Sequence, residues 1–346
     1  MPQIWNAVKY KLSKLRGFDS TYLRYDPLYL AIFVTSRCNL NCKFCSFHGL
    51  DRPSNYGLKF NDITMDIFRR LINRFKRAIN LELSGGEPFL HENLFEMVDY
   101  AHEHRINVKV PTNGILLRDR MDSTIRSHLS LLNISLNACN SDDYFRLNGC
   151  SAQTYHRLLE DISRLVERRN RYNHGLKITI SYVCTRANYG SIPNMVELAE
   201  KLGVDGIDLF NLIPHGIPGF LEDQCLYDDD TDVIEVIRSI TSPKSGLEVV
   251  MPRLYRRKPD GKGCDSPFRL LSIDFNGDTS PCCQIAPSEY YGNVLADNNI
   301  WNNSAFQRTR RIFTEQSLPL PDFCKTCNGM VAERRPSYVP RRRGIR

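Results

Sequence analysis

Short apolar runs rich in β-branched residues alternate along the chain with longer segments in which apolar residues recur at helical spacing. Six apolar runs predict strands, at residues 28–34, 81–83, 108–110, 132–136, 178–183 and 207–210. Six amphipathic segments predict helices, at residues 64–75, 93–104, 118–129, 154–172, 191–202 and 231–241. Strands that alternate with helices form parallel sheets, because each helical crossover returns the chain to the same edge. The pattern therefore predicts an α/β fold built from six β/α units.

A further amphipathic helix is predicted ahead of the first strand, over residues 4–16, with Gly17 placed to end it. Its apolar residues form one stripe: Ile4, Trp5, Val8, Leu12 and Leu15. Its basic residues lie at other positions around the helix: Lys9, Lys11, Lys14 and Arg16. We expect the stripe to pack against the rest of the protein, as most amphipathic helices do. The alternative is an interfacial helix attracted to an anionic surface.

The composition is that of a globular protein, with 42% hydrophobic and 25% charged residues among 346. The net charge is +7, but the last thirteen residues carry six arginines and no acid, so the rest is close to +1. We therefore expect residues 334–346 to be a disordered basic tail, and the body to bind no nucleic acid. No apolar run approaches the ~18–20 residues of a transmembrane segment, and no signal-peptide core is present. Twelve cysteines in such a chain favour metal ligation in a reducing, cytoplasmic environment.

Three cysteines follow the first predicted strand, at Cys38, Cys42 and Cys45. They lie on the loop that leaves the carboxyl end of this strand, which is the face where α/β barrels build their sites. Soft thiolates select iron–sulfur clusters, zinc or Cu(I), and three of them leave one iron of a four-iron cube without a protein ligand. A zinc knuckle or a redox pair is the alternative, but a fourth ligand is missing nearby.

The C-x3-C-x2-C spacing, with the aromatic Phe44 just before the third cysteine, resembles the signature of the radical S-adenosylmethionine (SAM) superfamily. The resemblance implies a [4Fe-4S] cluster whose free iron is chelated by the amino and carboxylate groups of SAM. It also implies a partial (β/α)6 barrel, similar to an incomplete TIM barrel, with the cluster loop after the first strand. The resemblance covers about residues 28–330.

Further residues resemble the SAM-binding positions of this family. Gly85-Gly86-Glu87-Pro88 follows the second strand; alone it is an ordinary tight turn, but one β/α unit after the cysteines it resembles the motif that holds the amino group of SAM. At the ends of the third and fourth strands the family places polar contacts to the ribose and carboxylate of SAM. The matching residues here are Asn113, Ser135, Asn137 and Arg146.

A second cysteine group lies near the C-terminus, where Asn276-Gly277 predicts a hairpin turn and a helix is predicted over residues 300–315. Its four thiols are Cys264, Cys282, Cys324 and Cys327. Four thiolates satisfy either tetrahedral zinc or a fully ligated four-iron cluster, and their spacing does not separate the two. The arrangement resembles the SPASM/twitch extension of radical SAM enzymes. Full SPASM domains carry further cysteines, so we expect one auxiliary [4Fe-4S] cluster.

Four regions are predicted: an N-terminal helix and lead-in (1–27), the partial barrel (28–245), the cysteine-rich extension (246–333) and the basic tail (334–346). Cys283, next to a predicted ligand, has three open roles. It is an alternative cluster ligand, an inert thiol or a catalytic hydrogen-atom donor.

The resemblance implies an enzyme that cleaves SAM reductively and removes hydrogen from a substrate C–H bond. We expect an oxidoreductase that dehydrogenates or epimerises a small or carbohydrate-like molecule, supplied with electrons by a partner such as flavodoxin or ferredoxin. A peptide-modifying maturase is an alternative, although only some 27 residues precede the first strand. An alternative from a different functional class is a non-catalytic iron–sulfur or zinc protein that binds a partner through its basic tail.

Overall fold

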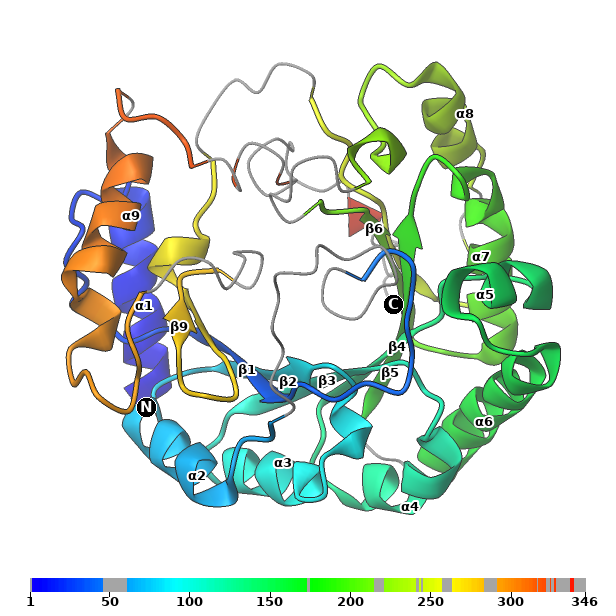
Figure 1. The fold of residues 1–346 in the computed structure, drawn as a ribbon, viewed down its shortest axis with the longest axis horizontal. Coiled ribbons are helices and arrows are strands. Elements are labelled where there is room, and N and C mark those ends of the chain that lie inside the picture. Colours follow the sequence, from blue (N-terminus) through cyan, green and yellow to red (C-terminus); the bar gives the residue numbers. More distant parts are fainter. Residues whose placement is uncertain are drawn as a thin grey trace, which may run out of the picture.

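The computed structural model describes residues 2–45, 61–172, 175–214, 221–240, 243, 245–256, 263–282, 291–315, 317–321, 324, 327 and 337–338. One curved sheet forms the centre of the molecule, and helices cover its outer face (Figure 1). The strand order is β10-β7-β6-β5-β4-β3-β2-β1-β8-β9. Because this order is linear and does not close on itself, the sheet is a partial barrel, as predicted.

The six predicted strands are all present, and each is parallel to the next. They are β1 (Tyr29–Thr35), β2 (Asn80–Gly85), β3 (Asn107–Thr112), β4 (Leu131–Ser135), β5 (Lys177–Cys184) and β6 (Gly206–Asn211). The six predicted barrel helices are α2 (Met65–Arg74), α3 (Leu94–Glu103), α4 (Leu117–Arg126), α6 (Ala152–Arg171), α7 (Ile192–Leu202) and α8 (Thr231–Ser239). A seventh, α5 (Ser141–Asn148), escapes the sequence pattern because only Tyr144 and Asn148 are buried in it.

Helix ends in the barrel follow local sequence signals. The Thr64 hydroxyl accepts a hydrogen bond from the Ile67 amide and caps α2. Gly203 ends α7 in the left-handed conformation, at φ 69°. The helices bury their apolar stripes against one face of the sheet. Along the strands apolar residues alternate with polar ones such as Glu82, Lys109 and Asn133, so the other face carries polar side chains, among them the Glu82–Lys109 ion pair.

The cysteine-rich extension adds strands to both edges of the barrel sheet. At one edge β7 (Glu248–Val250) runs parallel to β6, and at the other β8 (Leu270–Ile273) runs parallel to β1. The predicted hairpin is present, since β8 turns back into β9 (Thr279–Ser280), with Gly277 at φ +86°. The extension and the barrel therefore share one sheet.

The lead-in to the barrel is packed against the predicted C-terminal helix, which is observed as α9 (Ser304–Thr314) after a short 3-10 turn. The Asn302 side chain exchanges two 2.9 Å hydrogen bonds with the backbone of Leu23. The fully buried guanidinium of Arg310 lies over the Trp301 ring and donates to the Thr21 and Trp301 carbonyls. These contacts join the lead-in before β1 to the segment around α9.

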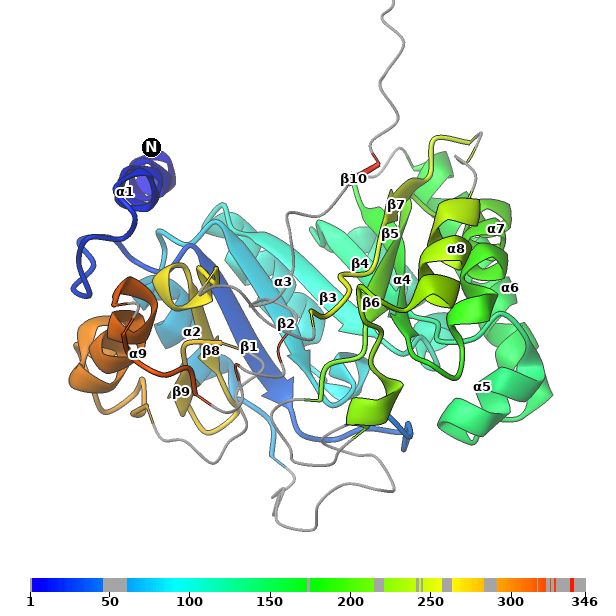
Figure 2. The same ribbon diagram turned by 90° about the horizontal axis from the view of Figure 1, so that it is seen from above.

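The N-terminal helix, α1 (Pro2–Leu15), is present and ends at Gly17 as predicted, but its expected orientation is wrong. Its apolar stripe faces away from the protein, and the buried residue of the helix is Asn6. The helix stands apart from the barrel helices (Figure 2). Polar side chains of α1 reach backbone carbonyls of the body, and this set of hydrogen bonds decides the orientation.

Within the described part of the chain, every helix is too short or too polar to cross a membrane. Most of the predicted disordered tail lies outside the described residues. Its described part, β10 (Ser337–Tyr338), pairs antiparallel with β7.

Candidate metal and cofactor site

The three predicted cluster cysteines lie on the loop that leaves the carboxyl end of β1. The amide of Cys45 donates to the Cys42 carbonyl at 3.0 Å, and the Lys43 amide donates to the Leu147 carbonyl of α5. Burial, together with repulsion from the two other thiolates, raises the pKa of Cys42 to about 12; burial also raises the pKa of Cys38. Three thiols on one short loop would repel one another when ionised and need a cation to balance their charge, so the donor set fits the chemistry of an iron–sulfur cluster.

The turn after β2 is held directly against the cysteine loop. The Gly86 amide donates to the Thr35 carbonyl at 2.8 Å, and the Glu87 amide donates to the Arg37 carbonyl at 2.7 Å. A Cβ atom on Gly86 would lie 2.0 Å from the Arg37 oxygen, and one on Gly85 would lie 2.2 Å from the Thr35 oxygen. Both positions therefore require glycine because the backbone of the cysteine loop approaches them closely.

Glu87 connects this turn to the end of β3. Its carboxylate is 1% exposed and accepts hydrogen bonds from the Thr112 hydroxyl (2.7 Å), the Asn113 amide (2.7 Å) and the Phe89 amide (3.0 Å). Burial raises the pKa of Glu87, and the three donors only partly offset this. The side chain is thus engaged in positioning its neighbours, and its assignment to the amino group of SAM stays a prediction.

The other predicted SAM contacts lie at or after the ends of β3 and β4 and on α5. Asn113 lies beside the cysteine loop, since its side-chain amide donates to the Asn39 side-chain oxygen at 2.7 Å. Ser135 lies at the end of β4, within 3.4 Å of the Ser181 hydroxyl. Asn137 is 6% exposed and accepts from the Val183 amide of β5. Arg146 is exposed on α5 and paired with Asp143.

Phe44 is half-buried on the cysteine loop, and Pro88 is buried at the start of a short 3-10 turn. The described contacts therefore join the cysteine loop to Gly85, Gly86, Glu87 and Asn113. Asn137 is bonded to β5 and Arg146 is paired with Asp143, and the roles of both in SAM binding remain predictions.

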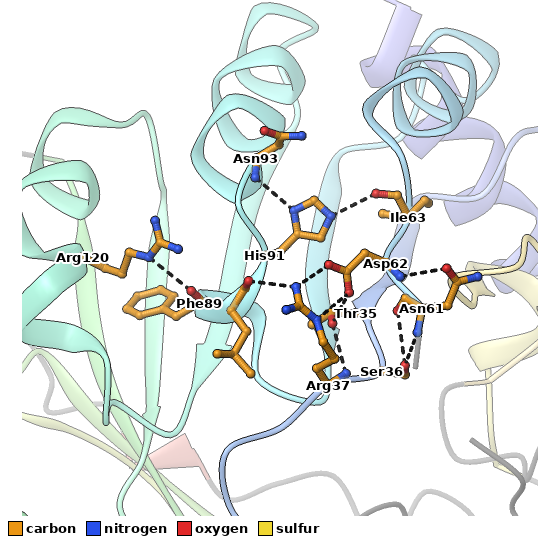
Figure 3. Close-up of polar contacts among 11 residues, drawn as sticks. Thr35, Ser36, Arg37, Asn61, Asp62, Ile63, Phe89, His91, Asn93 and Arg120 are labelled. Carbon is orange, nitrogen blue, oxygen red and sulfur yellow. Dashed lines mark hydrogen bonds and ion pairs between the residues drawn. The ribbon is translucent and has the colours of Figure 1, made fainter. Parts of the chain in front are cut away.

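A polar network that the sequence motifs do not reveal holds the residues just before the first cysteine (Figure 3). Arg37 forms a bidentate pair with Asp62, and its guanidinium also donates to the Leu90 carbonyl at 3.1 Å. The Thr35 hydroxyl donates to Asp62 at 2.6 Å and accepts from the Arg37 amide. Burial acts to raise the pKa of Asp62, but the hydrogen bonds from Arg37 and Thr35 outweigh it and the pKa is lowered.

The only sequence signal for this network is an arginine immediately before the first cysteine and an aspartate just before the next helix. Asp62 reaches Arg37 because Thr35 and Asp62 form an isolated antiparallel bridge. Nearby, His91 bonds to the Ile63 carbonyl and to the Asn93 amide, which holds the following segment in place. The network thus ties the residues just before Cys38 to the start of α2 and to the segment that follows the glycine turn.

The C-terminal cysteines are divided between two packing clusters. Cys264, Cys324 and Cys327 pack around the buried pair Cys225 and Tyr255. The fourth predicted ligand, Cys282, packs against the main core, and Cys283 lies outside the described residues. In the described chain, no three His, Cys, Asp or Glu side chains converge on a single metal-ion position. This applies to Cys38, Cys42 and Cys45 as well, so the assignment of both cysteine groups to clusters rests on their sequence pattern and on the family.

Comparison with protein families agrees with both cysteine groups. Residues 32–199 match the radical SAM superfamily, and residues 264–328 match an iron–sulfur cluster-binding domain of the SPASM type. The chain belongs to the radical SAM superfamily and carries a C-terminal SPASM domain. This membership implies a [4Fe-4S] cluster with SAM, and auxiliary iron–sulfur ligation in the SPASM domain.

Individual relatives differ in what they act on. The chain is 30% identical over 221 residues to a probable GTP 3',8-cyclase of Saccharolobus solfataricus, covering 62% of this chain and 66% of the relative, just under two thirds. It is 24% identical over 319 residues to the PqqA peptide cyclase of Granulibacter bethesdensis, covering 87% and 80%. Its fold resembles Streptococcus suis SuiB bound to SAM, with TM-score 0.67, 20% identity, and coverage of 89% and 72%.

Proposed function

We propose that this protein uses SAM to remove a hydrogen atom from a C–H bond of its substrate. The observation that carries the proposal is the three-thiol loop, held between the glycine turn of β2 and the Arg37–Asp62 pair. When bound, a reduced four-iron cluster supplies one electron to SAM, giving methionine and a 5'-deoxyadenosyl radical that takes the hydrogen atom. The protein contributes binding, orientation and exclusion of water.

The chain's own residues divide these tasks. Cys38, Cys42 and Cys45 would hold the cluster, and the glycine turn keeps the backbone of their loop in one position. Asn113, whose side-chain amide bonds to Asn39 on that loop, would contribute a polar contact to SAM. Ser135 offers a hydroxyl from the next strand end. Each would bind or orient SAM without itself taking part in bond cleavage.

The outcome that we propose is a two-electron oxidation, with epimerisation as the second possibility for the same site. After the hydrogen atom has left, oxidation requires the substrate radical to lose one electron and one proton. The auxiliary cluster predicted at Cys264, Cys282, Cys324 and Cys327 is a suitable electron acceptor. Epimerisation instead requires a thiol such as Cys283 to return a hydrogen atom to the other face. A flavodoxin- or ferredoxin-like reductant in a reducing cytoplasm would supply the first electron.

The substrate that we favour is a small or carbohydrate-like molecule, and a peptide is a second candidate. The peptide gains support from the match to a PqqA peptide cyclase, which extends over 87% of this chain. SuiB, which shares the fold, has also been described with a bound precursor peptide, SuiA.

The test begins with SAM alone. Anaerobically reconstituted protein with dithionite should convert SAM to 5'-deoxyadenosine and methionine, whereas a Cys38→Ala/Cys42→Ala/Cys45→Ala variant should not. Cys139→Ala, which removes a half-exposed thiol outside the predicted ligands, is the matched control and should retain the activity. Absence of 5'-deoxyadenosine from the fully loaded wild-type protein would refute the proposal in favour of a non-catalytic iron–sulfur protein.

Candidate substrates are then compared in D2O. A dehydrogenation gives a product two mass units lighter that retains no solvent deuterium. An epimerisation by Cys283 gives an inverted, singly deuterated product that disappears in Cys283→Ser while SAM cleavage continues. Stimulation of 5'-deoxyadenosine formation by a peptide, but by no sugar or cyclitol, would replace the small-molecule proposal with the peptide one.

A further inference from the structure

The helix α1 is attached to the protein by its polar face. Asn6, which is 4% exposed, donates to two backbone carbonyls and accepts from the Asp26 amide at 2.9 Å. Gln3 donates to the His104 carbonyl at 2.9 Å, and Tyr10 and Lys14 both bond to the Asp265 carboxylate. The helix is therefore fixed by hydrogen bonds and an ion pair, without burying its apolar stripe.

The apolar stripe of α1 is left in solvent. Five of the eight large hydrophobic side chains that are exposed in the described chain belong to this helix. They are Ile4 (63%), Trp5 (66%), Val8 (36%), Leu12 (49%) and Leu15 (83%). A continuous apolar face of this kind on a well-formed helix is more than the scattered exposure that is usual at protein surfaces. Something other than the body of this chain is therefore expected to cover it.

The charges around the stripe indicate what covers it. At 100° per residue, Lys9 and Arg16 flank the stripe on one side and Lys11 flanks it on the other, and all three are exposed. The first acidic residue of the chain is Asp19, so the helix carries only positive charge. A second copy of the helix laid against the first would bring these cations together. An anionic lipid surface instead pairs with the flanking cations while its hydrocarbon boundary accepts the stripe.

We propose that α1 anchors the protein to an anionic membrane surface, lying in the plane of the headgroups with Trp5, Leu12 and Leu15 immersed. The carbonyls that receive its polar face come just before β1, β2 and β3: Asp26, Lys76, Arg77, His104 and Arg105. These segments are at the amino ends of the strands, whereas the cysteine loop leaves the carboxyl end of β1. The anchor and the candidate metal site therefore occupy opposite ends of the barrel.

Tryptophan fluorescence of the full-length protein tests the anchor directly. The chain has two tryptophans, and Trp301 is 6% exposed, so a change on vesicle addition reports on Trp5. Vesicles of phosphatidylcholine mixed with phosphatidylglycerol should shift the emission to the blue and sediment the protein. Vesicles of phosphatidylcholine alone should do neither, and added salt should weaken the binding.

Two variants separate the apolar and the charged contributions. Leu12→Ser/Leu15→Ser, which keeps the Trp5 probe, should lower the partition coefficient about tenfold or more. Lys11→Glu/Arg16→Glu should abolish the preference for anionic vesicles. Tyr172→Ser, which replaces a comparably exposed aromatic residue just after the C-terminal end of α6, is the matched control and should bind as the wild type does. Circular dichroism checks that each variant is folded.

Three results would overturn the proposal. One is an unchanged emission maximum and no sedimentation with either kind of vesicle. Another is a blue shift without lipid that grows with protein concentration, together with a dimer mass in analytical ultracentrifugation, which would assign the stripe to a second copy. The third is equal binding to neutral and anionic vesicles, because the basic residues would then have no part.

Discussion

The two cysteine groups of this protein differ in how far apart their members are in sequence. Cys38, Cys42 and Cys45 lie within one loop, and the backbone before them is braced by the glycine turn and by the Arg37–Asp62 pair. The C-terminal cysteines come from separate places between residues 264 and 327, and three of them pack around Cys225 and Tyr255. The barrel therefore holds the backbone of the first loop through its own hydrogen bonds. We expect the second group, whose segments are distant in sequence, to depend more on its metal.

The largest expected effect is on chemistry at the first site. Replacing Cys38, Cys42 and Cys45 by Ala should abolish SAM cleavage and remove about four irons per chain, because these thiolates are the cluster's only protein ligands. The melting temperature of the barrel should change little, since the braces do not depend on the cluster. Iron analysis, 5'-deoxyadenosine assays and calorimetry measure the three quantities. If the triple variant still cleaves SAM, the assignment of these three cysteines as the cluster ligands is wrong.

The opposite pattern is expected at the second site. Cys324→Ala/Cys327→Ala should make residues 264–328 sensitive to protease and lower the thermal stability of that region, because metal ligation there contributes to folding. Mössbauer spectroscopy of the Cys38/Cys42/Cys45 triple variant should still show a four-iron cluster. Stoichiometric zinc at this site after anaerobic iron–sulfur reconstitution would make it a structural zinc knuckle instead.

Gly86→Ala tests the bracing of the first site without touching a ligand. Its Cβ would meet the Arg37 carbonyl at 2.0 Å, so the cysteine loop must move, at a cost of about 1–3 kcal/mol. We expect reduced cluster occupancy with an intact barrel. The matched control is Gly190→Ala, because a Cβ there meets nothing within 4 Å. Equal iron content in the two variants would mean that the loop tolerates displacement.

The smallest effect is expected from Asp62→Asn, which weakens the pair with Arg37. Both side chains are partly exposed, so the loss should be about 0.5–1 kcal/mol near neutral pH. Because the pKa of Asp62 is lowered in the folded protein, its contribution is present above the unfolded pKa of about 3.9 and lost as the pH falls below it. Denaturation curves of the two proteins should therefore converge below about pH 4. If the difference in unfolding free energy between the two proteins stays constant with pH, the Arg37–Asp62 ion pair is not its cause.

The sequence was sufficient for the barrel because its elements follow from periodic burial, and for the cysteines because their spacing is a local property. It was insufficient where a polar side chain has several possible hydrogen-bond partners. Glu87 could bind a ligand or its neighbours, and only the fold brings Thr112 and Asn113 within reach of its carboxylate. The same holds for α1, whose periodicity identifies an apolar stripe but not the side on which the protein lies. Asn6 decides that side through carbonyls that are distant in sequence.

The way in which α1 is seated also predicts a pattern of evolutionary change. The atoms that receive Gln3 and the Asn6 side-chain amide are main-chain oxygens, which every amino acid carries. Substitutions at the residues that supply these carbonyls, Asp26, Arg77 and His104, should therefore accumulate freely among homologous chains that keep the helix. Gln3 and Asn6 themselves should change only where the helix is lost. An alignment of homologues that retain this N-terminal segment would reveal that asymmetry.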